Sequence, residues 1–169
     1  TARAGADNNG TGSVTWFGTG NIFTDNGVNA TATVSSGGNT STHYLQATNF
    51  GFANPATANI TGIQVSINRF SSQNTSSNNV QDNVVSLIKA GAVTGNNNSL
   101  AGNWSTTTTT FANYGTVSDL WGTTWTPAQI NATNFGVALS ASINRTSGNT
   151  VTASVDYITI TVTYTIPCS

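Results

Sequence analysis

The sequence predicts an all-β fold, an antiparallel β-sandwich that is jelly-roll-like and has about eight to ten strands. Helical periodicity is nearly absent, whereas apolar and polar residues alternate wherever Val, Ile and aromatic residues cluster. Segments rich in Gly, Asn and Ser interrupt this alternation about every 8 to 15 residues, which is typical of turns between short strands. A net charge of −1 together with many β-branched residues favours a folded chain over a disordered one.

Three segments show the alternation most clearly, and each places mainly small or polar residues on the opposite face. Their apolar residues are Ile63, Val65 and Ile67; Phe135, Val137, Leu139, Ala141 and Ile143; and Ile158, Ile160, Val162, Tyr164 and Ile166. Weaker strands are expected at residues 14–17, 30–34, 43–47, 84–89 and 104–111. One helical turn is expected at residues 126–130, where Thr126 can cap the helix and Pro127 occupies its first position.

The chain divides into a short extension and one domain. A single β-sandwich domain is expected over residues 14–169, because 169 residues is the size of one domain. Residues 1–13 form an N-terminal extension with too few apolar residues to fold alone, so either its own domain or a neighbouring subunit must hold it. Its alternating small side chains suit a donor strand, which makes Ala2, Ala4 and Ala6 the candidate subunit-joining residues.

A short internal repeat places charges at matching positions. The sequence Ser-Ile-Asn-Arg ends at Arg69 and again at Arg145, and in each case a polar loop and a strand containing an Asp follow, at Asp82 and Asp156. Both units read as hairpins. Arg69 is in phase with the apolar residues of its strand, and so is Asp156. We therefore expect Arg69 and Arg145 to form ion pairs with Asp82 and Asp156, in some combination, that fix strand register.

The composition excludes several classes of function. The four basic residues are scattered, so no basic face for nucleic acid is expected, and no apolar run is long enough for a membrane span. The charged fraction is only 5%, with one His and one Cys, so we expect neither an enzyme nor a cofactor nor a zinc site. His43 lies in ordinary strand sequence, and Cys168 is a terminal thiol that either has no role or forms an intermolecular bridge.

A calcium site is left open by the sequence. Residues 25–27 (Asp-Asn-Gly) and 81–83 (Gln-Asp-Asn) offer oxygen ligands, but neither matches a known calcium-loop spacing, and residues 25–27 are explained more simply as a turn.

Aromatic residues and glycosylation sequences each allow two interpretations. The four Trp residues either pack in the core, which we favour, or form an exposed platform for sugars; they are Trp16, Trp104, Trp121 and Trp125.

Nine Asn-X-Ser/Thr sequences occur, where roughly seven are expected by chance from the Asn, Ser and Thr content, so they indicate composition rather than selection. The candidate N-glycosylation sites are Asn9, Asn29, Asn39, Asn59, Asn74, Asn97, Asn103, Asn131 and Asn144.

Three segments carry a resemblance to known proteins. They are LQATNFGFANP at residues 45–55, followed by ITGI at 60–63; YGTVSDLWG at 114–122; and NFGVAL at 134–139. Together they resemble β-sandwich domains of exported surface proteins, of phage virion proteins and of extracellular filament subunits. The resemblance spans about residues 16–164, implies a structural or adhesive role, and carries over no active-site residue.

These observations predict a structural subunit of an extracellular homopolymeric filament or pilus, joined by donor-strand exchange through residues 1–13. Its partners would be other copies of itself and attached glycans. Because the chain begins at Thr1 rather than Met, we expect export with removal of a signal peptide. Two alternatives stay open: a phage virion protein of the capsid surface or tail, and a carbohydrate-binding or adhesin module.

Overall fold

The computed structural model describes residues 2–168, and it is an antiparallel β-sandwich, as predicted. Thr1 and Ser169, the outermost residues of the two predicted ranges, lie outside the described residues. One sheet has four strands, in the order β2 (Ala30–Val34), β10 (Val151–Thr165), β5 (Asn59–Ser71) and β8 (Phe111–Tyr114). The other has six: β1 (Ala4–Asn8), β4 (Tyr44–Thr48), β9 (Gly136–Arg145), β6 (Asn78–Lys89), β7 (Ala92–Thr94), and β3 (Thr40–Ser41) beside β9.

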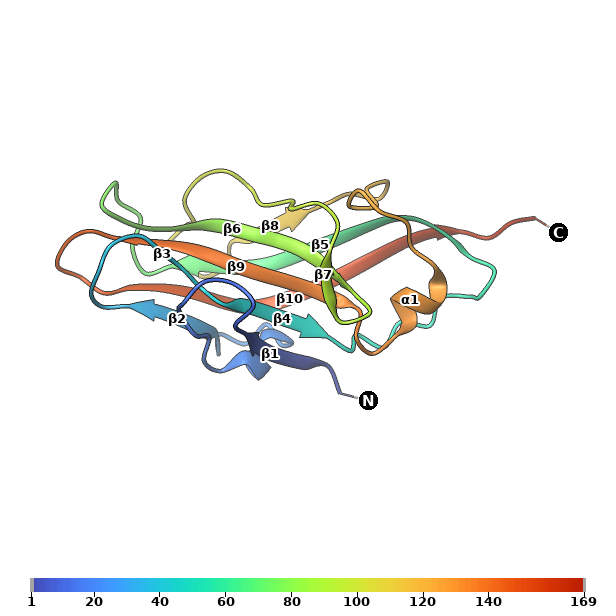
Figure 1. Ribbon diagram of the computed structural model, residues 1–169, viewed down its shortest axis with the longest axis horizontal. Helices are drawn as coiled ribbons and strands as arrows, with labels where there is room; N and C mark the ends of the chain where they lie inside the picture. The colour runs from blue at the N-terminus through green and yellow to red at the C-terminus, as the bar shows by residue number, and fades with distance from the viewer. Residues whose placement is uncertain (1, 169) are drawn as a thin grey trace.

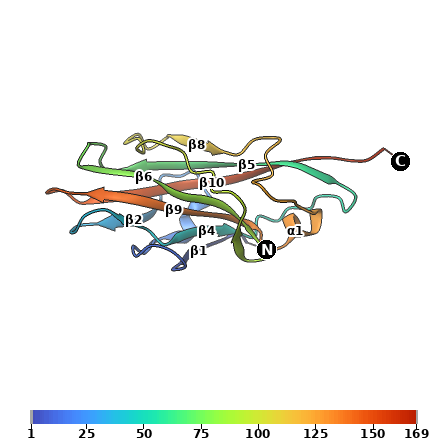
Figure 2. The same ribbon diagram turned by 45° about the horizontal axis from the view of Figure 1, so that its top comes forward.

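The strand order is that of a jelly roll to which two short strands, β1 and β3, are added. The order β2-β10-β5-β8 faces β4-β9-β6-β7, and the chain changes sheets after β1, β2, β4, β5, β7, β8 and β9. The strands run along the long axis of the body, and the C-terminal residues project beyond one end (Figures 1 and 2). β1 lies outside this set of eight strands, at the edge beside β4.

The core lies between the sheets and is filled mainly by the predicted alternating residues, but Tyr164 and Ile166 at the end of the last predicted strand are exposed. Ile63, Val65 and Ile67 are fully buried, as are Leu139 and Ile158. All four Trp residues are buried as well, with at most 7% of any of them exposed, so the packing interpretation is confirmed and no exposed Trp platform exists. Such burial removes large apolar areas from water, which is the main stabilising contribution in a chain with so few charges.

The helical turn is also confirmed, as α1 (Pro127–Asn131), which lies at one end of the body (Figure 1). Its start is a capping box, because Thr126 Oγ1 accepts a hydrogen bond from Gln129 N while the Gln129 side chain accepts one from Thr126 N. A short 3₁₀ helix, η1 (Thr19–Ile22), precedes β2 and was not expected.

Three expectations were wrong. Residues 14–17 form only single bridges, at Val14 and Phe17, rather than a strand. The strand expected at 104–111 begins only at Phe111, because the preceding run of threonines has no apolar alternation and forms a turn. The two Ser-Ile-Asn-Arg units are not hairpins, since the chain crosses to the opposite sheet after each of them.

Candidate functional site

The N-terminal extension is held by its own domain in this structure. β1 pairs antiparallel with β4 over five residue pairs, from Ala4 opposite Thr48 to Asn8 opposite Tyr44. Before the strand begins, Asn49 Nδ2 donates a 2.6 Å hydrogen bond to the carbonyl oxygen of Ala2. Of the two holders expected from the sequence, the domain itself therefore provides the contacts.

The side chains of β1 have the opposite phase to that expected for joining residues. Ala2, Ala4 and Ala6 are exposed, whereas Gly5 and Asp7 face the domain. A Cβ atom at Gly5 would overlap the carbonyl oxygen of Thr19, so the strand can approach η1 this closely only because position 5 is glycine. Thr19 Oγ1 also donates to the Gly5 carbonyl, at 3.1 Å. The close packing of β1 against the domain therefore depends on Gly5 rather than on the alanines.

Asp7 anchors the strand through both carboxylate oxygens. Its Oδ1 accepts a 2.8 Å hydrogen bond from the backbone N–H of Trp16, and its Oδ2 lies 2.8 Å from His43 Nδ1. The Trp16 indole in turn donates to the His43 carbonyl. His43 therefore has a structural partner, and no serine hydroxyl or cysteine thiol bonds to its ring within residues 2–168.

The edges of the two sheets carry almost no charge. The four edge strands β1, β2, β7 and β8 contain one charged residue between them, Asp7, and that residue faces the domain. Monomeric β-proteins commonly protect such edges with Lys, other charges or Pro, because an unpaired edge invites pairing with another chain. These edges lack that protection.

The predicted pair of Arg69 and Asp82 lies between the two sheets. Arg69 Nε is 3.3 Å from Asp82 Oδ1 and donates a 2.6 Å hydrogen bond to the Tyr114 hydroxyl. Asp82 also accepts from the Trp104 indole, at 2.8 Å, and from Leu100 N, at 2.9 Å. Burial raises the pKa of Tyr114 above that of an ordinary tyrosine; the Asp82 carboxylate raises this pKa further, while Arg69 opposes the rise.

The other predicted pair is not formed. Arg145 donates to the carbonyl oxygens of Gly148 and Asn149 in its own loop, and the structure pairs it with no carboxylate among residues 2–168. Asp156 was expected to face the core in phase with Ile158. A β-bulge between Val155 and Tyr157 makes Asp156 an extra residue instead, and this changes its phase.

The glycosylation candidates differ in accessibility. Six of their side chains are exposed and three are half-buried: Asn9, Asn39, Asn59, Asn74, Asn97 and Asn103 are exposed, and Asn29, Asn131 and Asn144 are half-buried. The amide nitrogens of Asn97 and Asn103 already donate hydrogen bonds, to Asn83 O and Asn74 Oδ1. Asn9, Asn39, Asn59 and Asn74 therefore have the most accessible amide nitrogens in the described part of the chain.

Of the remaining candidates, Cys168 is an exposed free thiol. The carboxylate of Asp82 is fully engaged in the core, so residues 81–83 do not form a calcium loop. Within residues 2–168, no helix is long and apolar enough to cross a membrane. Comparison with protein-family models, with curated proteins and with solved structures gives no match for the chain.

Proposed function

We propose that this chain is a structural subunit of an extracellular homopolymeric filament, in which the N-terminal strand of one copy pairs with β4 of the next by donor-strand exchange. The observation that carries the proposal is the fitted place of a terminal strand at a sheet edge, outside the eight strands of the jelly roll. A strand from a second copy would make the same contacts through Gly5 and Asp7, so exchange replaces one set of contacts with an identical set.

The link between β1 and the domain favours this exchange. Residues 9–13 contain Gly10 and Gly12 and no apolar side chain, so hydrogen bonds from Ser13 to β3, rather than apolar packing, hold the link against the domain. The body also keeps all eight jelly-roll strands when β1 leaves, and a folded domain with an open β4 edge is the expected intermediate. The nearly uncharged edge strands and the accessible Asn residues suit a glycosylated assembly outside the cell.

A pair of engineered cysteines tests the exchange directly. Ala6 and Gln46 are opposite each other in the β1–β4 pair, and neither is buried, so Ala6→Cys with Gln46→Cys should form a disulfide across the strands. The variant also carries Cys168→Ser, so that no other thiol is present. If neighbouring copies exchange β1, oxidation of the assembled protein links chains covalently, and a non-reducing gel shows a ladder of multimers.

The matched control places the same two cysteines in a pair that cannot exchange in this way. Thr33 and Thr152 are opposite each other in β2 and β10, with their hydroxyl oxygens 3.0 Å apart, and both lie inside the domain. Thr33→Cys with Thr152→Cys should therefore give disulfides within single chains only. The proposal fails if the Ala6–Gln46 variant assembles but gives only such intrachain disulfides, or if the unmodified chain stays monomeric at high concentration.

The alternative of a carbohydrate-binding module depended on exposed Trp rings, and the Trp rings are buried in the core. Imaging of the native particle separates a free filament from a virion.

A further inference from the structure

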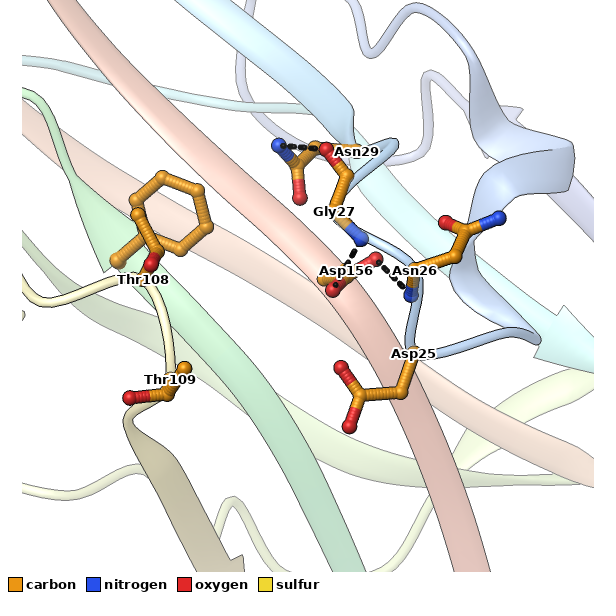
Figure 3. A pocket seen from close by; sticks show the side chains of 8 residues that line it. Asp25, Asn26, Gly27, Asn29, Thr108, Thr109 and Asp156 are labelled. Atoms are coloured by element: carbon orange, nitrogen blue, oxygen red, sulfur yellow. Dashed lines mark hydrogen bonds between the residues drawn. The ribbon is translucent and has the colours of Figure 1, made fainter.

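A second feature, on the outer face of the four-stranded sheet and independent of the proposed filament, points to a ligand. A pocket of about 360 Å³ lies between the loop at residues 25–29 and the loop at residues 108–109 (Figure 3). Phe70 of β5 and Asp156 of β10 line it from the sheet, and the Asp25 carboxylate points into it. Its lining includes two carboxylates and no basic side chain.

Asp156 is a buried carboxylate without a counter-charge. Only 3% of the residue is exposed, and its side chain accepts hydrogen bonds from the backbone of Gly27, at 3.0 Å, and of Asn26, at 3.5 Å. The structure places no Lys, Arg or His against it among residues 2–168. A buried charge normally has an ion partner or binds a metal, because removing it from water is costly.

The β-bulge places Asp156 next to Asn68, a residue whose side-chain oxygen has no hydrogen-bond partner. Val155 is opposite Arg69 and Tyr157 is opposite Asn68, so Asp156 is the extra residue next to Asn68 on the outer face of the sheet. Asn68 is 1% exposed, and its Oδ1 atom is buried without any hydrogen-bond partner. Buried polar oxygens without a partner are rare in folded proteins, and each one calls for an explanation.

A second such oxygen lies in the loop that covers the site. Asn29 lines the pocket, and its Oδ1 is also buried without a partner, while its Nδ2 donates to the Gly27 carbonyl at 3.4 Å. Two of the three buried unpartnered side-chain oxygens of the described residues therefore belong to this one region; the third, in Asn144, lies in the other sheet.

We propose that the pocket binds a calcium ion through the side-chain oxygens of Asp25, Asn29 and Asp156, which line it, and of Asn68, which lies next to Asp156 across the β5–β10 pair, with water completing the shell. Calcium takes six to eight oxygen ligands in flexible geometry, and it accepts carboxylate and amide oxygens together. Magnesium demands near-ideal octahedral geometry, and zinc prefers nitrogen and sulfur ligands, which this pocket lacks. The ion would neutralise the two carboxylates and tie the loop before β2 to the sheet.

Titration of the full chain, freed of metal by a chelator, tests the site. Isothermal titration with calcium chloride should show one ion per chain, with a dissociation constant between about 10⁻⁵ and 10⁻³ M, and calcium should raise the melting temperature. Terbium offers a second readout, because Tyr157 adjoins Asp156 and can sensitise the luminescence of a bound lanthanide, which calcium should then displace.

Two variants and two matched controls assign the ligands. Asp25→Asn alters an exposed loop residue and should weaken calcium binding more than about tenfold; Asn68→Ala removes the unpartnered oxygen and should also weaken it. Asp119→Asn makes the same change in charge outside the pocket, and Asn144→Ala removes the third unpartnered oxygen; both should leave the affinity unchanged.

The outcomes separate the alternatives. The absence of both heat and thermal shift at millimolar calcium overturns the proposal, and so does equal affinity in Asp25→Asn and the unmodified chain. If neutral monosaccharides stabilise the chain where calcium does not, and Asp25→Asn removes that effect, the pocket is a sugar site and the cation assignment is wrong. If Asn68→Ala does not fold, the comparison of calcium affinity between Asp25→Asn and Asp119→Asn still decides whether the pocket binds calcium.

Discussion

Asp82 and Asp156 occupy matching places in the two Ser-Ile-Asn-Arg units, yet their surroundings differ completely. Asp82 lies between the sheets and is bound by Arg69, the Trp104 indole, the Tyr114 hydroxyl and Leu100 N. Asp156 lies on an outer face and is bound by backbone N–H groups alone. After one unit the aspartate belongs to a complete polar network; after the other it has no basic partner among residues 2–168.

The difference arises from the position of one extra residue. In β6 the register shifts between Asp82 and Val84, so Asp82 itself stays paired, opposite the buried Ala141, and faces the core. In β10 the register shifts between Val155 and Tyr157, so Asp156 is the unpaired residue. A bulge displaced by one residue reverses the face on which a side chain lies, and here it decides whether an aspartate stabilises the core or is available to a ligand.

The largest expected difference in stability is between substitutions of Arg69 and Arg145. Arg69→Ala should lower the free energy of unfolding by about 3–5 kcal/mol, because it leaves the Asp82 charge buried without its cation. Arg145→Ala should lower it by less than about 0.5 kcal/mol, since Arg145 bonds only its own loop. Urea denaturation of both variants measures the difference, and equal losses would show that the two repeats are energetically equivalent.

Substitution of the two aspartates should also lower the free energy of unfolding more at Asp82 than at Asp156, but by a smaller difference than for the two arginines. Asp82→Asn leaves Arg69 buried without its anion and should cost about 3 kcal/mol. In the presence of a chelator, Asp156→Asn should cost no more than about 1.5 kcal/mol, because an amide oxygen can still accept from Gly27 N and one unpaired charge disappears. A loss as large as that of Asp82→Asn would mean that Asp156 is already fully compensated in the metal-free chain.

The sequence predicted those parts of the fold in which apolar alternation runs without interruption. It located β5, β9 and β10, and it expected Arg69 to pair with Asp82 or Asp156; Arg69 faces the core and pairs with Asp82, because no bulge intervenes between the apolar residues of β5 and Arg69. It could not place Asp156, since nothing in a sequence of Val, Ser and Thr marks where a strand inserts a residue. For β1 the sequence predicted a strand but the wrong inward face, because the residues that face the domain are Gly5 and Asp7 rather than apolar ones.

The proposed calcium ligands illustrate the same limit. Of the four, only Asp25 was considered as a ligand from the sequence, because Asn29, Asn68 and Asp156 come from separate segments that the fold brings together. Asn68 belongs to the repeated Ser-Ile-Asn-Arg motif, in which the sequence predicts an interaction only for the arginine that follows it. Spacing along the chain carries no information on a site of this kind.

The Asp82 network should also impose a pH dependence through Tyr114. The pKa of Tyr114 is raised in the folded state, so its contribution to stability is present below the unfolded pKa of about 10 and is lost as the pH rises above that value. Tyr114→Phe should cost about 1–2 kcal/mol at neutral pH, and this cost should shrink above pH of about 10. Urea midpoints of both proteins across this range measure the effect; a constant difference would contradict it.

The smallest expected effect concerns salt, and it distinguishes the two aspartates by screening. The Arg69–Asp82 pair is buried, so raising sodium chloride from about 0.05 to about 1 M should change neither the stability that it provides nor the degree of assembly by much. Asp25 and Asp156 line one pocket that contains no basic side chain. Because Asp25 is exposed, dissolved salt can screen the repulsion between the two carboxylates. In the presence of a chelator, salt should therefore stabilise the unmodified chain slightly more than Asp25→Asn, by a few tenths of a kcal/mol (~0.3). Urea midpoints of both chains are measured at the two salt concentrations, and the difference between the chains removes the general effects of salt on stability. An identical salt response in both chains would show that the two carboxylates do not interact.

For assembly, a pronounced dissociation in molar salt would show that charge contacts join the subunits.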